Sequence, residues 1–415
     1  MPTTHDRPSL TPDEARVLEL IDQDDLVALT KELVRAPGHN PPGEEAATAQ
    51  VLLEACRSRG LRIEVTEVAP GRPNISAQLP GGAGPGLLLL GHTDVVPPGE
   101  GWSASPWEAG LREGRLYGRG TADMKGGLAA CVIALDALRR AGVELSGPVE
   151  LAALVDEEET GLGIRHYMAQ LDAGPRPPFL GCVVAEPTDL QTIIAARGDC
   201  YVEITVHGLA AHSGRPDDGR NAIYGAARIV EDLRRWHDEL KEHAHPLVGP
   251  PTWSVGLLSG GQGTSTVPAQ ALISADRRLL PGEDAEQVLA DVRTRIGSLG
   301  LADDGLTVEM SMPMSMPGFE TAAAHQFVTV TEQALQESGG PDLGLAGWTA
   351  ACDGGFIARD GGVPTLVLGP GSVNDQAHRP DESVAVDDLV VAARVYALTA
   401  LRLLGESPHA DGPRD

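Results

Sequence analysis

The sequence predicts an α/β fold in which a doubly wound, mostly parallel sheet is interrupted by an inserted βαββαβ (ferredoxin-like) domain. In the first and last parts of the chain, short apolar runs alternate with segments in which apolar residues recur at helical spacing, as in a parallel sheet covered by helices. The middle has the order strand, helix, strand, strand, helix, strand, which closes an antiparallel sheet with two helices on one face. We expect 1–198 and 313–415 to form one domain and 199–312 the other.

Four short apolar runs of the first domain have the character of fully buried parallel strands. They cover residues 87–90, 149–155, 182–185 and 363–368. Helical spacing predicts helices over 13–35, 44–59, 124–140, 163–171 and 386–404. In the inserted domain we expect strands over 201–207, 252–258, 271–279 and 306–312, and helices over 221–240 and 284–299. These elements provide the inserted domain with a core of its own.

Composition excludes several classes of function. The 415 residues include 32 Lys and Arg against 59 Asp and Glu, a net charge of −27, so a polyanionic partner such as nucleic acid is not expected. No uninterrupted apolar run of 18 residues predicts a membrane span, and the first residues have no secretory-signal pattern. The five cysteines are scattered and form no CxxC pair, which favours a cytoplasmic location.

Titratable side chains follow the predicted strands of the first domain. In open α/β sheets, ligands bind outside the carboxyl ends of the strands, where loops and helix N-termini converge. One further carboxylate, Asp123, lies in the glycine-rich segment that opens the helix at Met124. The side chains that follow strands are His92, Asp94, Asp156, Glu157, Glu158, Glu159, Glu186 and His378.

So many carboxylates at one edge of a sheet repel one another unless cations or protons are bound. A mixed set of His, Asp and Glu without Cys suits Zn²⁺, Mn²⁺ or Co²⁺, and two such ions would share a bridging carboxylate. Two divalent ions carry four positive charges, and three ligand carboxylates would leave a net charge of one on the site. One bound hydroxide would neutralise that charge. The sequence therefore predicts a dinuclear hydrolase whose nucleophile is metal-bound water.

Five motifs in this order resemble a known family. They are LGHTDVVP (90–97), GRGTADMKGG (118–127), DEE (156–158), EPT (186–188) and AHRPDE (377–382). The chain resembles the dinuclear zinc peptidases and deacylases that include acetylornithine deacetylase, succinyl-diaminopimelate desuccinylase, aminoacylase and glutamate carboxypeptidase. The resemblance extends over nearly the whole chain and implies that the inserted domain serves as a lid and dimerisation domain.

The resemblance also implies roles for individual residues. His92, Asp123 and Glu186 would hold one ion, and Asp123, Glu158 and His378 the other. Asp94 would accept the second ring N–H of His92 and fix its tautomer. Glu157 would be the general base that passes a proton from the bridging water to the leaving amine. A one-residue shift of the acidic run remains open, in which Glu158 is the base and Glu159 the ligand. The family tends to have the peptide bond between Asp123 and Met124 in the cis form.

Two residues of the inserted domain also match the family. His212 corresponds to a histidine that, in dimeric members, reaches the partner's site and stabilises the oxyanion; a loop histidine that caps a turn is the alternative. Arg278 corresponds to an arginine that binds a substrate carboxylate, although a surface arginine at a strand edge is equally compatible with the pattern. We accordingly expect a homodimer formed through the inserted domain.

The substrate is expected to be an N-acyl amino acid or a dipeptide. Desuccinylases of the family have Ser-Asp-Gly-Arg-Phe where this chain has CDGGF (352–356), so the arginine for an extra acyl carboxylate is replaced by Gly355. GPGS (369–372) and QAH (376–378) resemble acetylornithine deacetylases more closely. We therefore expect a deacylase of small, neutral N-acyl groups, with a dipeptidase, a carboxypeptidase or a desuccinylase using the same site as alternatives.

Overall fold

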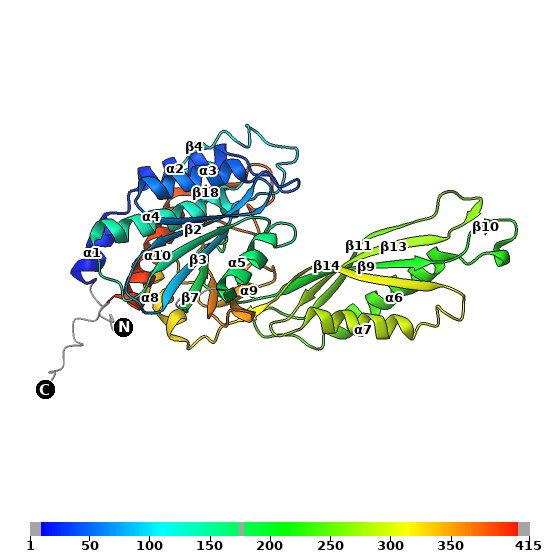
Figure 1. Cartoon of the computed structure of the whole chain (residues 1–415). Helices are drawn as coiled ribbons and strands as arrows, with labels where there is room; N and C mark the ends of the chain where they lie inside the picture. Colours follow the sequence, from blue (N-terminus) through cyan, green and yellow to red (C-terminus); the bar gives the residue numbers. More distant parts are fainter. Residues whose placement is uncertain (1–9, 174–177, 406–415) are drawn as a thin grey trace, which may run out of the picture. The chain divides into compact units, whose positions relative to one another are not determined.

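A computed structural model describes residues 10–173 and 178–405, and the chain divides into two compact units (Figure 1). Unit 1 contains Met1–Ile194, Thr321–Ala346 and Phe356–Asp415, and unit 2 contains Ala195–Glu320 and Gly347–Gly355. The insertion expected at 199–312 lies entirely within unit 2, which also includes short flanking segments on both sides. The expected division into domains at 198/199 and 312/313 stays a prediction.

The sheet of unit 1 is parallel at its centre, as the sequence predicts. Four strands form this centre in the order β6 (Val149–Leu154), β3 (Gly86–His92), β7 (Phe179–Val184) and β17 (Thr365–Val367), and every neighbouring pair is parallel. An antiparallel hairpin, β1 (Arg62–Ala69) and β2 (Arg72–Leu79), extends the sheet beside β6. Beyond β17, the sheet continues with β8 (Ile193–Ala196), which pairs with β15 (Phe319–Glu320) and β16 (Ala346–Trp348).

Helices cover both faces of this sheet (Figure 1). On one face, α4 (Gly126–Ala141) approaches β3 closely, and a Cβ atom at Gly91 would collide with Met124, just before α4, and with Leu128 of α4. On the other face, Tyr167 of α5 (Leu162–Ala173) donates a hydrogen bond to Glu150 of β6. The remaining helices are α1 (Pro12–Glu19), α2 (Gln23–Arg35), α3 (Ala46–Ser58), α8 (Gln326–Glu337), α9 (Gly354–Arg359) and α10 (Val386–Leu404).

The first predicted helical segment, 13–35, is two helices rather than one. α1 ends at Glu19 and α2 begins at Gln23. Asp22 has extended backbone between them, and its carboxylate accepts hydrogen bonds from the backbone N–H groups of Asp24 and Asp25. An aspartate in this position satisfies N–H groups that have no partner inside a new helix, so the chain begins a second helix here.

Unit 2 has the predicted βαββαβ order. Its strands are β9 (Gly198–His207), β11 (Thr252–Gly260), β13 (Gln270–Leu279) and β14 (Thr307–Met316), and its helices are α6 (Ala222–Leu240) and α7 (Ala285–Gly297). The sheet order is β11-β13-β9-β14, and all neighbours are antiparallel. Apolar side chains of the sheet and the two helices form one buried cluster. A short ribbon, β10 (Ala211–His212) with β12 (Thr266–Val267), lies outside this sheet.

A three-stranded sheet joins distant parts of unit 1. β5 (Arg115–Tyr117) pairs with β4 (Gly110–Arg112) on one side and with β18 (Ser383–Ala385) on the other. All five cysteines are buried free thiols. Within residues 10–173 and 178–405, no helix is both long and apolar enough to cross a membrane.

Candidate functional site

The predicted site residues of unit 1 meet at the carboxyl ends of its parallel strands. His92 is the last residue of β3, Glu157 and Glu158 follow β6, and Glu186 follows β7. Asp123 lies in a kinked turn, η1 (Thr121–Lys125), that leads into α4. Gly127 allows the start of α4 to approach Ala185, which directly follows β7, because a Cβ atom at Gly127 would clash with the carbonyl oxygen of Ala185.

Asp123 lies between two imidazoles. Its Oδ1 is 3.1 Å from Nε2 of His92, and its Oδ2 is 3.3 Å from Nε2 of His378. The peptide bond between Asp123 and Met124 is cis, as the resemblance implies. One carboxylate therefore connects the two histidines, although they are 286 positions apart in the chain.

Each histidine also contacts a second carboxylate. Nε2 of His92 is 3.2 Å from Oε1 of Glu186, and Nε2 of His378 is 3.0 Å from Oε2 of Glu158. His92 is buried, whereas the His378 side chain is 53% exposed, so one end of the cluster is open to solvent. These contacts bring all five predicted ligands into one cluster.

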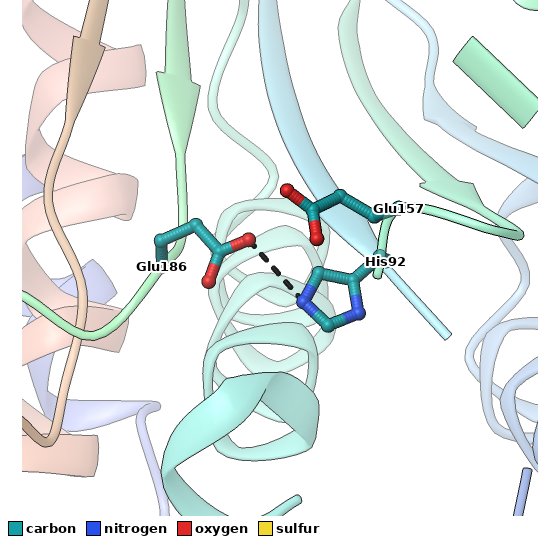
Figure 2. Close-up of side chains that lie close together, drawn as sticks. All are labelled: His92, Glu157 and Glu186. Carbon is teal, nitrogen blue, oxygen red and sulfur yellow. Dashed lines mark ion pairs between the residues drawn. The ribbon is translucent and has the colours of Figure 1, made fainter. Parts of the chain in front are cut away.

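Glu157 belongs to the same cluster. Figure 2 shows its carboxylate beside His92 and directed toward Glu186. Potential ligand atoms of these three residues lie within 4.8 Å of one another, as do those of His92, Asp123 and Glu158. These two groups of three residues differ from the two predicted ligand sets. They contain only residues that the sequence predicted as metal ligands or as the general base.

Burial and neighbouring charges strongly shift the pKa values of residues in this cluster. Hydrogen bonds with Asp123 and Glu158 raise the pKa of His378 to about 10. Burial raises the pKa of Glu186 to about 7, and nearby carboxylates add to this rise, whereas His92 opposes it. Burial opposes ionisation of Asp123 as well, yet its two imidazole partners hold the pKa of Asp123 well below the usual range.

The cluster has an excess of acidic groups over cations. In the described part of the chain, no Lys or Arg side chain pairs with Asp123, Glu158 or Glu186, and all three carboxylates are largely buried. Buried carboxylates so close together require bound cations or protons. Histidine nitrogens and carboxylate oxygens are ligands that divalent transition metals accept, so the donor set fits such ions.

Asp94 contacts both His92 and the backbone of the acidic turn. Its backbone carbonyl oxygen is 3.0 Å from Nδ1 of His92, while its carboxylate oxygen is 3.5 Å away. The carboxylate instead accepts the backbone N–H groups of Glu157 at 3.3 Å and Glu158 at 3.2 Å. Asp94 thus contacts His92 and also anchors the acidic turn, a second contact that the sequence did not predict.

The other members of the acidic run lie differently. Asp156 is buried and pairs with Arg72 at 2.7 Å, and it belongs to neither potential metal-binding group of the described residues. Glu159 is exposed and belongs to none of the potential metal-binding groups found among residues 10–173 and 178–405.

Glu382 is a site residue that the sequence interpretation missed. It is fully buried, and one carboxylate oxygen accepts the N–H groups of Ala122 at 2.9 Å and Asp123 at 3.1 Å. Its other oxygen pairs with the buried Arg119 at 2.6 Å. Glu382 thus fixes the backbone that carries Asp123. The motif AHRPDE contained the signal, but the interpretation went no further than His378.

The two remaining predicted residues lie in unit 2. His212 is exposed on β10, and its Nδ1 accepts a hydrogen bond of 3.0 Å from the backbone N–H of Gly214. Arg278 on β13 is 2.9 Å from Asp276 and 3.3 Å from Asp199. Two carboxylates of its own unit therefore already contact the Arg278 guanidinium. The roles expected for both residues stay predictions.

Comparisons with known proteins point to one family. The model of peptidase family M20/M25/M40 matches residues 88–402. Acetylornithine deacetylase of Proteus mirabilis (strain HI4320) is 35% identical over 349 residues, which cover 81% of this chain and 85% of that protein. Acetylornithine deacetylase of Vibrio campbellii (strain ATCC BAA-1116) is 33% identical over 332 residues, covering 79% and 84%.

Solved structures share the fold at lower identity. An M20 family metallo-carboxypeptidase from Sulfolobus solfataricus has a TM-score of 0.74 at 20% identity, covering 95% of this chain and all of that one. A tripeptidase from Staphylococcus aureus has a TM-score of 0.73 at 20% identity, covering 92% and 99%. The matched region includes His92, Asp123, the acidic turn, Glu186 and His378, and the chain is a hydrolase of peptidase family M20/M25/M40.

Proposed function

We propose that this protein is a metal-dependent amidohydrolase that removes a small, neutral acyl group from an N-acyl amino acid, as acetylornithine deacetylases do. The observation that carries the proposal is the cluster in which Asp123 lies between His92 and His378, with Glu158 and Glu186 on the outer sides. A buried site of this composition needs bound cations or protons for charge balance, and its His, Asp and Glu donors suit divalent cations.

Two ions are proposed in this cluster. His92, Asp123 and Glu186 would hold the first, and Asp123, Glu158 and His378 the second. The contact of each Asp123 oxygen with a different histidine supports a bridging role. Zn²⁺ is our first choice, and Co²⁺ or Mn²⁺ suit the same donors. Bound there, the ions would polarise the acyl carbonyl and lower the pKa of a water molecule.

Glu157 is proposed as the general base. It would take the proton of the attacking water and donate it to the nitrogen of the leaving amine, which must be protonated for the amide bond to break. The position of Glu157 beside His92 and Glu186 supports this role (Figure 2). The exposure of Glu159 weighs against the shifted assignment, in which Glu158 is the base and Glu159 the ligand.

The acyl group is proposed to be small and uncharged. Gly355 replaces the arginine expected in desuccinylases, and a Cβ atom at Gly355 would clash with the carbonyl oxygen of Pro317. No larger side chain fits at position 355 on this backbone, so a cation for a succinyl carboxylate cannot come from there. The acetylornithine deacetylases at 35% and 33% identity further support an acetyl substrate.

We further propose a homodimer in which His212 stabilises the oxyanion in the partner's site. Unit 2 carries most of the large apolar side chains that are exposed in the described ranges, including Tyr224 at 71%, Leu257 at 68% and Leu258 at 53%. Contiguous patches of exposed apolar side chains mark protein interfaces, and the number of such side chains on unit 2 is compatible with an interface there. The exposure of His212 on the same unit is compatible with a reach into another subunit.

A substrate comparison tests the proposed activity. Metal-loaded protein is offered N-acetylornithine, other N-acetyl amino acids, N-succinyl-diaminopimelate and dipeptides in parallel, and release of the free amine is measured. We expect the highest kcat/KM for N-acetylornithine or another N-acetyl amino acid. The same preparation of Glu157→Ala controls for contaminating hydrolases. A higher kcat/KM for dipeptides would instead make the protein a dipeptidase.

A further inference from the structure

Asn40 is a buried amide that lies between two buried carboxylates. Its Nδ2 donates to Oδ2 of Asp94 at 3.0 Å and to Oδ1 of Asp156 at 2.8 Å, and the residue is 3% exposed. Ionised carboxylates only accept hydrogen bonds, so the amide nitrogen rather than the amide oxygen must face them. Both N–H bonds of this side chain are therefore engaged by acidic residues.

The backbone holds Asn40 in this position. Its N–H donates to the carbonyl oxygen of Val95 at 2.9 Å, and the N–H of Val95 donates to the carbonyl oxygen of Gly38 at 2.9 Å. This pairing attaches the segment 38–40 to the residue that directly follows Asp94. The two main-chain hydrogen bonds of Val95 therefore set the distance between Asn40 and Asp94.

Through the carboxylates of Asp94 and Asp156, Asn40 connects the segment that contacts His92 to the acidic turn. Asp94 contacts His92 through its carbonyl oxygen and accepts the N–H groups of Glu157 and Glu158. Asp156 precedes Glu157 in the chain, and its carboxylate also accepts the N–H of Leu162 at 3.2 Å. The amide therefore cross-links Asp94 to the start of the turn that carries Glu157 and Glu158.

We propose that Asn40 is a positioning residue that fixes the acidic turn relative to His92. The inference rests on the proposed function, in which Glu157 is the base and Glu158 a metal ligand. Without the amide, Arg72 would still pair with Asp156, but no donor would connect Asp156 to Asp94. The repulsion between the two carboxylates would then displace the turn. Loss of a partner that supports metal ligands typically costs roughly 10- to 100-fold in metal affinity or activity.

Asn40→Ala is the first test, with Asn74→Ala as a matched control. Asn74 is 4% exposed and its side chain bonds to the backbone of Val155 and Gly163, so it supports the same loop without touching Asp94. We expect Asn40→Ala to lower kcat and the affinity for Zn²⁺ by roughly 10- to 100-fold each, with KM little changed. Asn74→Ala should lower thermal stability but leave kcat and Zn²⁺ affinity close to wild type. Equal losses in the two variants would overturn the proposal.

A second test separates positioning from folding. Asn40→Asp alone places a third carboxylate beside Asp94 and Asp156 and should be the least stable variant. Asn40→Asp combined with Asp156→Asn restores the net charge and allows a hydrogen bond between positions 40 and 156, although the ion pair of Asp156 with Arg72 is lost. A carboxylate at position 40 cannot donate to Asp94. We expect the double variant to be more stable than Asn40→Asp alone, while kcat and Zn²⁺ affinity stay low. Recovery of kcat and Zn²⁺ affinity together with thermal stability would overturn the proposal.

The Zn²⁺ titrations use no substrate and therefore test Asn40 separately from the activity. A wild-type protein that binds Zn²⁺ but hydrolyses no N-acyl amino acid would overturn the proposed function. The Zn²⁺ affinities of the variants would still decide whether Asn40 positions the site.

Discussion

At the scale of single residues, the site depends on a few side chains that each make more than one contact. Asp123 contacts both histidines, and Asp94 contacts His92 as well as the backbone of the acidic turn. Because each of these carboxylates serves two partners, the effect of a substitution depends on which partner loses its contact. Glu157 differs from them, since the only role proposed for it is proton transfer.

Replacing Glu157 tests this role directly. Glu157→Ala should lower kcat by roughly 10²- to 10⁴-fold, because the general base is lost, while the metal content stays at two ions per chain. Kinetics and metal analysis of the same preparation measure both quantities. The adjacent, exposed Glu159 provides the control, and Glu159→Ala should keep nearly full activity. Full activity of Glu157→Ala together with a large loss in Glu159→Ala would favour the shifted assignment of the acidic run.

A pH dependence of stability is expected from Asp199, at the start of β9. The residue is 5% exposed and its Oδ1 has no hydrogen-bond partner among the described residues. Burial raises the pKa of Asp199 to about 6, although Arg278 opposes this rise. In the unfolded chain the group ionises near pH 4. Between these values the folded protein binds more protons, so ionisation of Asp199 lowers the free energy of unfolding as the pH rises.

Asp199→Asn removes this ionisation. The stability of the variant relative to wild type should therefore increase by about 1 kcal/mol between pH 5 and pH 7.5. Urea unfolding at the two pH values measures the difference. Asp303→Asn, at an exposed position of the same unit, controls for the substitution itself. A difference that does not change with pH would show that Asp199 is not protonated in the folded state.

At the scale of elements, the carboxyl ends of the parallel strands and the segment around Glu382 form the site together. Glu382 directly precedes β18, which pairs with β5 just before the loop that carries Asp123. Its carboxylate binds both Arg119 and the N–H groups of Ala122 and Asp123. The position of Asp123 therefore depends on a segment about 260 residues later in the chain.

Glu382→Ala should destabilise the protein strongly. The buried Arg119 would lose its carboxylate partner, and removing one partner of a buried pair typically costs about 3–5 kcal/mol. Urea unfolding of metal-free protein measures the loss. Glu382→Gln retains an acceptor oxygen and the shape of the side chain, so it should be less damaging. Similar small losses in both variants would mean that the pair contributes little to stability.

At the scale of the whole molecule, the two units carry different parts of the proposed mechanism. The metal cluster and the base belong to unit 1, whereas His212 belongs to unit 2. Unit 2 also exposes most of the large apolar side chains of the described ranges. A homodimer that buries these side chains could bring His212 of one subunit to the site of the other.

Complementation tests this arrangement. Glu157→Ala and His212→Ala proteins should each be nearly inactive. After unfolding and refolding as an equal mixture, they should regain about a quarter of wild-type activity, because half of the dimers are mixed and each mixed dimer has one intact site. Activity and size-exclusion chromatography with light scattering measure the outcome. Failure to complement in a verified dimer would place the action of His212 within its own subunit or exclude it.

Much of the fold followed from patterns local to the sequence. Continuous apolar runs predicted β3, β6, β7 and β17, because parallel strands buried on both faces are apolar throughout. The hairpin of β1 and β2 was not predicted. β1 has mostly exposed and half-buried residues, so neither apolar alternation nor a continuous run marks it. Strands of this kind depend on the neighbouring strand that pairs with them.

Local sequence patterns were sufficient to predict the fold class, the family resemblance and most residues of the candidate site, because strand ends and their motifs are local features. The contacts between these side chains became known from the three-dimensional structure. It joined Asp123 to both histidines, attached the acidic turn to Asp94 and Asn40, and brought Glu382 to the backbone of Asp123. These contacts connect residues that lie far apart in the chain. No local pattern encodes them, because they form only when the sheet and its helices pack.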